Sequence, residues 1–93
     1  MRVEVHLYFP FRGEVGESPV VLTLPPGTDV AGAVAALAAR YPALNARLFD
    51  AAGRVHRHIS ALVNGTSVQF KEGFGTPLAD GDVLTLLPPV GGG

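Results

Sequence analysis

The chain has 93 residues and a formal net charge of -1, and 47% of its residues are hydrophobic. This length suits one small domain, and the hydrophobic share is that of a packed globule rather than a disordered chain. Because no excess of basic residues is available to neutralise phosphates, we expect no direct nucleic-acid partner. The sequence contains no cysteine, which excludes disulfides, thiolate nucleophiles and cysteine-ligated metals.

No targeting or membrane signal is visible in the sequence. The residues that follow Met1 lack the apolar region of a signal peptide. No apolar run approaches the ~20 residues needed to span a bilayer. We therefore expect a cytoplasmic protein with no membrane partner.

The first part of the chain predicts two strands joined as a hairpin. Residues 2–9 alternate between apolar and polar side chains, which is the two-residue period of a half-buried strand. A loop punctuated by Gly13, Gly16 and Pro19 follows, and residues 20–24 form the second predicted strand.

A helix is predicted after Pro25-Pro26-Gly27. Thr28 or Asp29 offers a side-chain oxygen to the free amides of the helix start. Pro42 ends the helix, because the residue before a proline is pushed out of helical geometry. An apolar stripe at helical spacing connects these two signals, and it consists of Val30, Val34, Leu37, Ala38 and Tyr41.

The second half predicts a short helical turn and three strands. Leu44, Leu48 and Phe49 anchor the turn, and residues 50–53 reverse the chain. One strand begins near residue 58 and ends at Asn64-Gly65, a tight-turn signal. A short partner strand over 66–70, a loop anchored by Leu78, a turn at 80–82 and a last strand over 83–87 follow.

This order of elements predicts an α+β roll. We expect a mixed sheet of four to five strands with one main helix across one face. Residues 1–87 would form the domain, and residues 88–93 a flexible, extended C-terminal tail. The paired Asp80 and Asp82 flank a glycine and are explained as turn residues rather than as an acid–base pair.

The last strand and the tail carry the functional signal. Alternation places Leu84 and Leu86 in the core and Leu87 on the outer face. There Leu87 either contacts a partner or packs under the loop at 70–74. Pro88-Pro89 then directs the chain away from the sheet in an extended form. Val90 adds one apolar side chain that a partner could contact. The six residues 88–93 can span about 20 Å when extended. Because Gly91-Gly92-Gly93 carries no side chains, this tail can enter a narrow channel.

These residues resemble a known family, the MoaD/ThiS-like ubiquitin-fold sulfur carriers. The ending Leu87-Pro88-Pro89-Val90-Gly91-Gly92-Gly93 is similar to the Phe-Pro-Pro-Val-x-Gly-Gly ending of that family. The resemblance implies a β-grasp (ubiquitin-like) fold and covers nearly the whole chain. Its other matching segments are Pro26 to Val30, Leu62 to Gly65, Thr76 to Leu78 and Asp80 to Asp82.

Two features depart from the family pattern. Leu87 stands where molybdopterin-synthase small subunits often have phenylalanine. The segment from Leu48 to His58 is longer than in the shortest carriers, and it is similar to a subgroup with CysO-like carriers and archaeal MoaD-like modifiers. These departures leave the pathway open.

The resemblance implies a role for each tail residue. An E1-like, MoeB-like enzyme would use ATP to adenylate Gly93. Sulfur would then displace AMP and leave a thiocarboxylate on Gly93. Gly92, which has no side chain, would leave Gly93 accessible to the enzyme. Leu87, Pro88, Pro89, Val90 and Gly91 would bind partners. The chain itself would be a non-catalytic subunit that holds no cofactor.

The resemblance also implies possible destinations for the sulfur. We expect donation in molybdenum cofactor biosynthesis, with the chain as the small subunit of molybdopterin synthase beside its large subunit. The alternatives are a CysO-like carrier that serves a cysteine synthase, a carrier for tRNA thiolation, and a ubiquitin-like modifier of lysines. A ubiquitin-fold interaction module with an inert tail is the non-carrier alternative.

Two histidines are candidate metal ligands. His56 and His58 are two residues apart and would share a face if they lay on a strand, but no further ligand completes a set. We therefore expect no metal. With Arg54 and Arg57 they form a basic patch that would suit an acidic surface on a partner.

Overall fold

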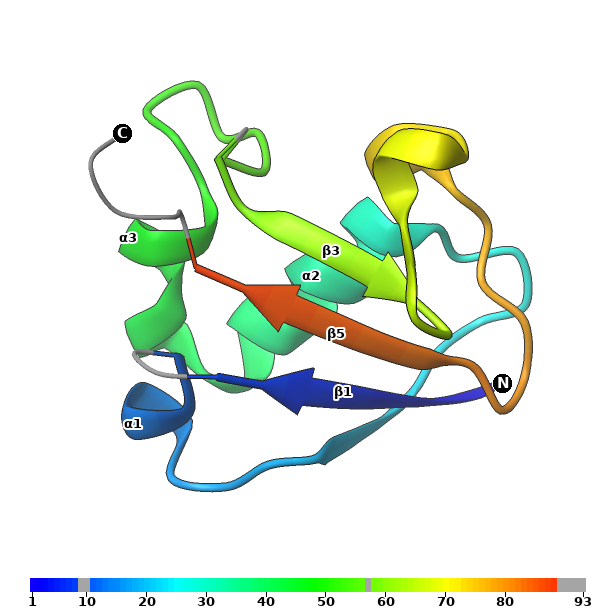
Figure 1. Cartoon of the computed structure of the whole chain (residues 1–93). Helices are drawn as coiled ribbons and strands as arrows, with labels where there is room; N and C mark the ends of the chain where they lie inside the picture. Colours follow the sequence, from blue (N-terminus) through cyan, green and yellow to red (C-terminus); the bar gives the residue numbers. More distant parts are fainter. Residues whose placement is uncertain (9–10, 57, 89–93) are drawn as a thin grey trace.

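The computed structural model describes residues 1–8, 11–56 and 58–88. Its centre is a five-stranded mixed sheet in the order β2-β1-β5-β3-β4, and helix α2 (Val30–Arg40) crosses one face of this sheet (Figure 1). The predicted α+β roll is therefore confirmed. The strands are β1 (Arg2–Leu7), β2 (Val20–Thr23), β3 (Ser60–Val63), β4 (Thr66–Ser67) and β5 (Val83–Leu87).

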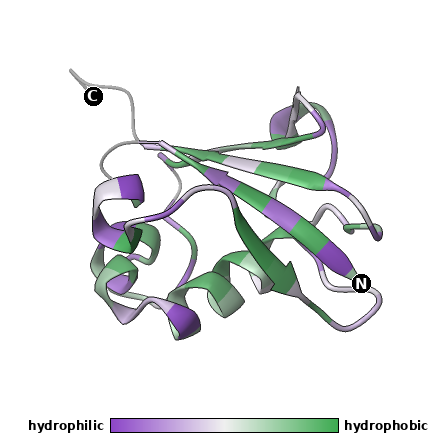
Figure 2. Ribbon diagram, turned by 90° about the horizontal axis from the view of Figure 1, so that it is seen from below, coloured by the Kyte–Doolittle hydropathy of each residue, from purple (hydrophilic) through white to green (hydrophobic). Residues whose placement is uncertain are grey.

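Alternation along the strands builds one face of the core. Val3, Val5 and Leu7 are almost wholly buried, whereas Arg2 and Glu4 are exposed. Figure 2 shows this alternation as hydrophobic and hydrophilic bands along neighbouring strands. The same period in β5 buries Leu84 and Leu86.

The connection from β1 to β2 differs from the prediction. The two strands pair antiparallel, as expected for a hairpin, but the expected loop contains a short helix, α1 (Phe11–Val15). The physical reason is Phe11, whose side chain is 1% exposed and so anchors this turn to the core. Gly16 ends the helix with a φ of +84°.

Helix α2 begins and ends where the sequence indicated. Of the two candidate caps, Asp29 is the one used, because its Oδ1 accepts the Gly32 N–H at 2.8 Å. The Thr28 hydroxyl instead donates to the Pro25 carbonyl at 2.7 Å. The helix stops at Arg40, ahead of Pro42.

The segment after α2 packs as two short helical turns. These are η1 (Pro42–Leu44) and α3 (Asn45–Leu48), and they bury Leu44 and Leu48 completely. The predicted turn at 50–53 is present, and the Asp50 N–H donates to the Arg54 carbonyl at 2.8 Å. Phe49 is half-buried and packs against the core.

The connection from β3 to β5 is partly as predicted. Asn64 and Gly65 both have positive φ angles, 50° and 85°, which confirms the tight turn. The partner strand β4 is shorter than expected, because the chain leaves it for the 3-10 turns η2 (Val68–Phe70) and η3 (Gly73–Gly75). Leu78 is 5% exposed and is the predicted anchor. Within the described residues, no helix has the length and apolar character needed to cross a membrane.

Candidate functional site at the end of the last strand

Strand β5 is the central strand of the sheet, and its end fixes where the predicted tail begins. It pairs parallel with β1 on one side, where Leu86 lies opposite Leu7. It pairs antiparallel with β3 on the other side, where Leu87 lies opposite Ser60. Because hydrogen-bonded neighbours hold both edges and the Leu84 and Leu86 side chains are fully buried, the last strand residue has a well-defined position.

Leu87 lies on the open face of the sheet, as the alternation predicted. Its side chain and that of Pro88 are half-buried. The alternative that Leu87 packs under residues 70–74 is wrong. Leu87 pairs with the start of β3, whereas residues 70–74 follow β4, which pairs with the end of β3 (Figure 1).

The remaining tail residues lie outside the described residues. Pro88 is the last residue described, and the roles of Pro89, Val90, Gly91, Gly92 and Gly93 therefore stay predictions.

Two residues that the sequence did not single out share this end of the sheet. Tyr8 follows Leu7, the partner of Leu86, and is 54% exposed. Ser60 is half-buried beside Leu87. We call Tyr8, Ser60, Leu87 and Pro88 the exit surface. The alternation of the first strand shows that Tyr8 faces outward, but only the parallel pairing of β1 with β5 brings it to the end of β5.

The two histidines lie before β3 rather than on a strand, so the idea of a shared strand face is wrong. The His58 N–H donates to His56 Nδ1 at 3.2 Å, and the ring centroids are 5.2 Å apart. This backbone-to-ring hydrogen bond is a local turn contact. Across the described ranges, no group of three His, Cys, Asp or Glu side chains is placed to hold a metal ion. Of the expected basic patch, Arg57 lies outside the described residues.

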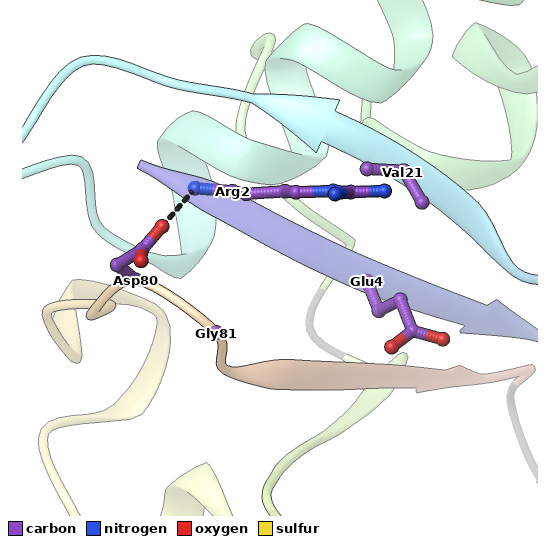
Figure 3. Close-up of a pocket in the computed structure, with 5 residues that line it drawn as sticks. All are labelled: Arg2, Glu4, Val21, Asp80 and Gly81. Carbon is purple, nitrogen blue, oxygen red and sulfur yellow. Dashed lines mark hydrogen bonds between the residues drawn. The ribbon is translucent and has the colours of Figure 1, made fainter.

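The two aspartates near the end of the chain have structural roles, as predicted. Asp82 accepts the Ala79 N–H at 2.8 Å and the Asn64 side-chain amide at 2.9 Å. Asp80 accepts the Arg2 N–H at 2.7 Å, beside a polar hollow of about 560 Å³ (Figure 3). This hollow lies at the start of β1 and β5, the opposite end of the sheet from the exit surface.

An apolar groove of about 580 Å³ lies on the other side of the molecule, on the outer face of α2. Small residues of the helix form its floor, and the segment at 49–55 and Phe74 form its walls. The sequence marked Phe49 as an anchor but did not indicate a groove. The lining residues include Ala31, Gly32, Ala35, Phe49, Val55 and Phe74.

Comparison with known proteins gives a consistent result. The model of the ThiS family matches residues 8–93. Small archaeal modifier protein 3 of Haloferax volcanii is 33% identical over 93 residues, which is 100% of both chains. The sulfur carrier protein CysO of Mycobacterium tuberculosis is 43% identical over 68 residues, or 70% of this chain and 73% of that protein.

The fold agrees with these sequence matches. The crystal structure of small archaeal modifier protein 1 from Haloferax volcanii superposes with a TM-score of 0.88 at 32% identity, covering 100% of both chains. The mixed sheet crossed by α2 is thus the β-grasp fold of ubiquitin-like proteins. The chain belongs to the ThiS family, whose members similar to it are small sulfur carriers and ubiquitin-like modifiers.

Proposed function

We propose that this protein is a sulfur carrier whose Gly93 is converted to a thiocarboxylate. The observation that carries the proposal is the position of β5: the diproline and glycines follow directly after the central, doubly paired strand. The folded domain would thereby hold the start of the tail at the end of β5, and the tail would finish in three glycines without side chains.

The chemistry explains why activation is needed. A terminal carboxylate has a reference pKa near 3.3–3.7 and is ionised at neutral pH, so it is a poor electrophile. An activating enzyme would join a Gly93 carboxylate oxygen to the α-phosphorus of ATP and release pyrophosphate. A sulfide or persulfide sulfur then attacks the carbonyl carbon, and AMP leaves with the bridging oxygen. A sulfide leaves the thiocarboxylate directly, whereas a persulfide leaves it once the sulfur–sulfur bond is reduced.

The protein's own residues would orient the tail rather than catalyse. Gly92 and Gly91 let the chain enter a channel too narrow for side chains. Pro88 and Pro89 limit the directions in which the tail leaves the sheet. Leu87, half-buried at the exit surface, offers apolar area to the partner that receives the tail.

The proposed partners follow from this chemistry. An E1-like, MoeB-like enzyme would bind the domain and use ATP. A second enzyme would then take up the sulfur-bearing tail. For this acceptor we propose the large subunit of molybdopterin synthase, on the strength of the Pro88-Pro89-Val90 sequence before the glycines.

A second candidate acceptor is a cysteine synthase. The observation in its favour is the 43% identity to the sulfur carrier protein CysO. The similarity to small archaeal modifier protein 3 favours attachment to lysines in the same way. All of these roles share the activated Gly93, and they differ only in the nucleophile or acceptor that meets it.

Sulfur transfer to defined acceptors tests the proposal. The thiocarboxylated protein is mixed separately with a molybdopterin synthase large subunit plus pterin precursor, and with a cysteine synthase plus activated serine. The acceptor that consumes the thiocarboxylate identifies the pathway. A variant without Gly92 and Gly93 is the control and should transfer no sulfur. If the shortened variant keeps the protein's cellular role, the chain is an interaction module instead.

A further inference from the structure

The apolar groove on the outer face of α2 has no part in the proposed function. Its volume of about 580 Å³ is in the range of small-ligand sites. Its floor consists of Ala31, Gly32 and Ala35, which carry no side chain beyond a β-carbon. An extended chain can therefore approach the helix closely between the aromatic walls formed by Phe49 and Phe74.

Backbone contacts hold the walls of this groove in place. Phe49 and Val55 form an isolated antiparallel bridge. Phe74 lies in η3, where the Thr76 N–H donates to the Gly73 carbonyl at 3.1 Å. Both phenylalanines and Val55 also pack against the core. The groove is thus formed before any ligand binds, which lowers the entropic cost of binding.

Arg54 is the one charged residue among the described residues that line the groove. Its side chain is exposed, and none of the ion pairs found in the described part of the chain involves it. The neighbouring Asp50 carboxylate accepts the backbone N–H groups of Ala52 and Arg54, at 2.9 and 3.1 Å. An arginine beside apolar walls suits a ligand that is apolar along its length and carries a carboxylate at one end.

The C-terminal tail of this protein has that chemistry. Pro88, Pro89 and Val90 are apolar, and three glycines follow them. In the proposed function the tail ends in a free carboxylate at Gly93. Segments that contain prolines are extended before they bind, and they dock in grooves lined by aromatic side chains. The glycines would let the rest of the tail lie flat against the groove.

The groove is better placed for the tail of a second copy than for the tail of its own chain. The start of α2 is held by the segment before β5, because the Val30 N–H donates to the Thr76 carbonyl at 3.0 Å. In Figure 1, residues 76–82 run along the side of the molecule where β5 starts, and β5 ends on the other side. Strand β5 is about 15 Å long. Val90 of the same chain lies at most about 7 Å from Pro88, so it falls short of the floor of the groove.

From these observations, and resting on the free Gly93 carboxylate of the proposed function, we infer that the groove on α2 binds the C-terminal tail of a second copy of this protein. Val90 lies over the small residues of the floor, and the Gly93 carboxylate pairs with Arg54. Each copy gives its tail to one neighbour and receives the tail of another, so the contact is head-to-tail and increases with protein concentration. A tail held in the groove is withdrawn from the activating enzyme.

NMR spectra of the isotope-labelled full chain test this inference. Over a dilution series, the backbone amide signals of Ala31, Gly32 and Ala35 should shift with protein concentration. The synthetic peptide Pro-Pro-Val-Gly-Gly-Gly, which copies residues 88–93, should shift the same signals when it is added to dilute protein. The same peptide with a C-terminal amide should bind about two- to five-fold more weakly, because it lacks the charge that pairs with Arg54.

Two substitutions of arginine form a matched pair. Arg54→Gln removes the charge and keeps the local turn, whose hydrogen bonds use backbone atoms of residue 54. This variant should bind the acid and the amide peptide equally. Arg12→Gln makes the same charge change on α1 and should preserve the two- to five-fold difference. Ala35→Glu places a larger, acidic side chain on the floor of the groove and should abolish the shifts caused by the peptide and by concentration.

Three results would overturn the inference. The first is that the acid peptide leaves the signals of the groove unmoved, and the second is that the acid and amide peptides bind the wild-type protein equally. The third is that these signals are independent of concentration but move when Gly92 and Gly93 are deleted, which would assign the groove to the tail of its own chain. The proposed function fails separately, if the protein gains no sulfur from an active E1-like enzyme, because binding of the peptide requires no activation.

Discussion

At the scale of single residues, the start of α2 depends on close contacts around Gly32. A β-carbon added at Gly32 would lie 2.7 Å from Thr28 Cγ2 and 3.2 Å from Asp29 Oδ1. The second atom is the oxygen that caps the helix. The glycine, which a helix normally disfavours, is explained by the space that the Thr28 methyl group and the cap occupy.

Gly32→Ala tests this explanation in two backgrounds. Helix propensity alone would stabilise the fold by about 1 kcal/mol, but we expect no gain, or a loss, in the wild-type background. Thr28→Ser removes the crowding methyl group and keeps the hydroxyl, so Gly32→Ala should then raise the free energy of unfolding by about 1 kcal/mol. Chemical denaturation of the four proteins measures this. An equal gain in both backgrounds would show that the contact is unimportant.

Asp50 provides a second prediction at the scale of single residues, which concerns how the stability of its turn depends on pH. Hydrogen bonds from the backbone N–H groups of Arg54 and Ala52 hold the pKa of the Asp50 carboxyl below its ordinary value. The carboxylate therefore stabilises the turn above the unfolded-state pKa, and this contribution is lost as the pH falls through the lower folded-state pKa. An NMR titration of the side-chain carboxyl should show a lower midpoint for Asp50 than for an unfolded peptide containing it. An equal midpoint would contradict the assigned hydrogen bonds.

At the scale of elements, β5 combines core packing on one face with the proposed partner contact on the other. The Leu86 side chain is fully buried, and the Leu87 side chain is half-buried at the exit surface. In the proposed function, neighbouring residues of one strand thus have different roles: Leu86 packs the domain, and Leu87 contacts the partner that receives the tail.

Leu86→Ala and Leu87→Ala form a matched pair for this separation. We expect Leu86→Ala to lower the free energy of unfolding by about 2–5 kcal/mol, because it leaves a cavity in the core. Leu87→Ala should cost less stability and slow thiocarboxylate formation by the activating enzyme. Urea denaturation and the initial rate of activation check the two effects. The division of roles fails if Leu87→Ala is activated at the wild-type rate.

The elements also show how far the sequence alone leads. Alternation and caps predicted the strands and α2, because these signals are local. The helix at Phe11–Val15 was missed, since glycines at 13 and 16 suggest a loop while the burial of Phe11 depends on distant neighbours. The extended tail stays a prediction from composition, because residues 89–93 lie outside the described residues. Tyr8 and Ser60 were not recognised at the site, because strand pairing between residues far apart in sequence brings them there.

At the scale of the whole molecule, the proposed function gives separate tasks to the folded domain and to the C-terminal glycines. Among the described residues, the buried core begins at Val3 and ends at Leu86. The glycines at 91–93 contribute no side chain to it. Changes in the tail should therefore alter reactivity without altering the fold.

Deletion of Gly92 and Gly93 tests this independence. We expect the free energy of unfolding to stay within about 0.5 kcal/mol of the wild-type value, because glycine has no side chain to bury in the core. The same variant should gain no sulfur. Thermal or urea unfolding, measured beside the activation assay, decides the point. A markedly destabilised variant would mean that the glycines take part in the fold.

The most direct test of the carrier role is the intact mass of the protein after incubation with its E1-like enzyme, ATP and a sulfide source. We predict a mass gain equal to the replacement of one oxygen by one sulfur, absent when Gly93 is deleted. An unchanged mass, with an enzyme that activates another carrier in the same assay and is shown to bind this protein, would contradict the proposed function.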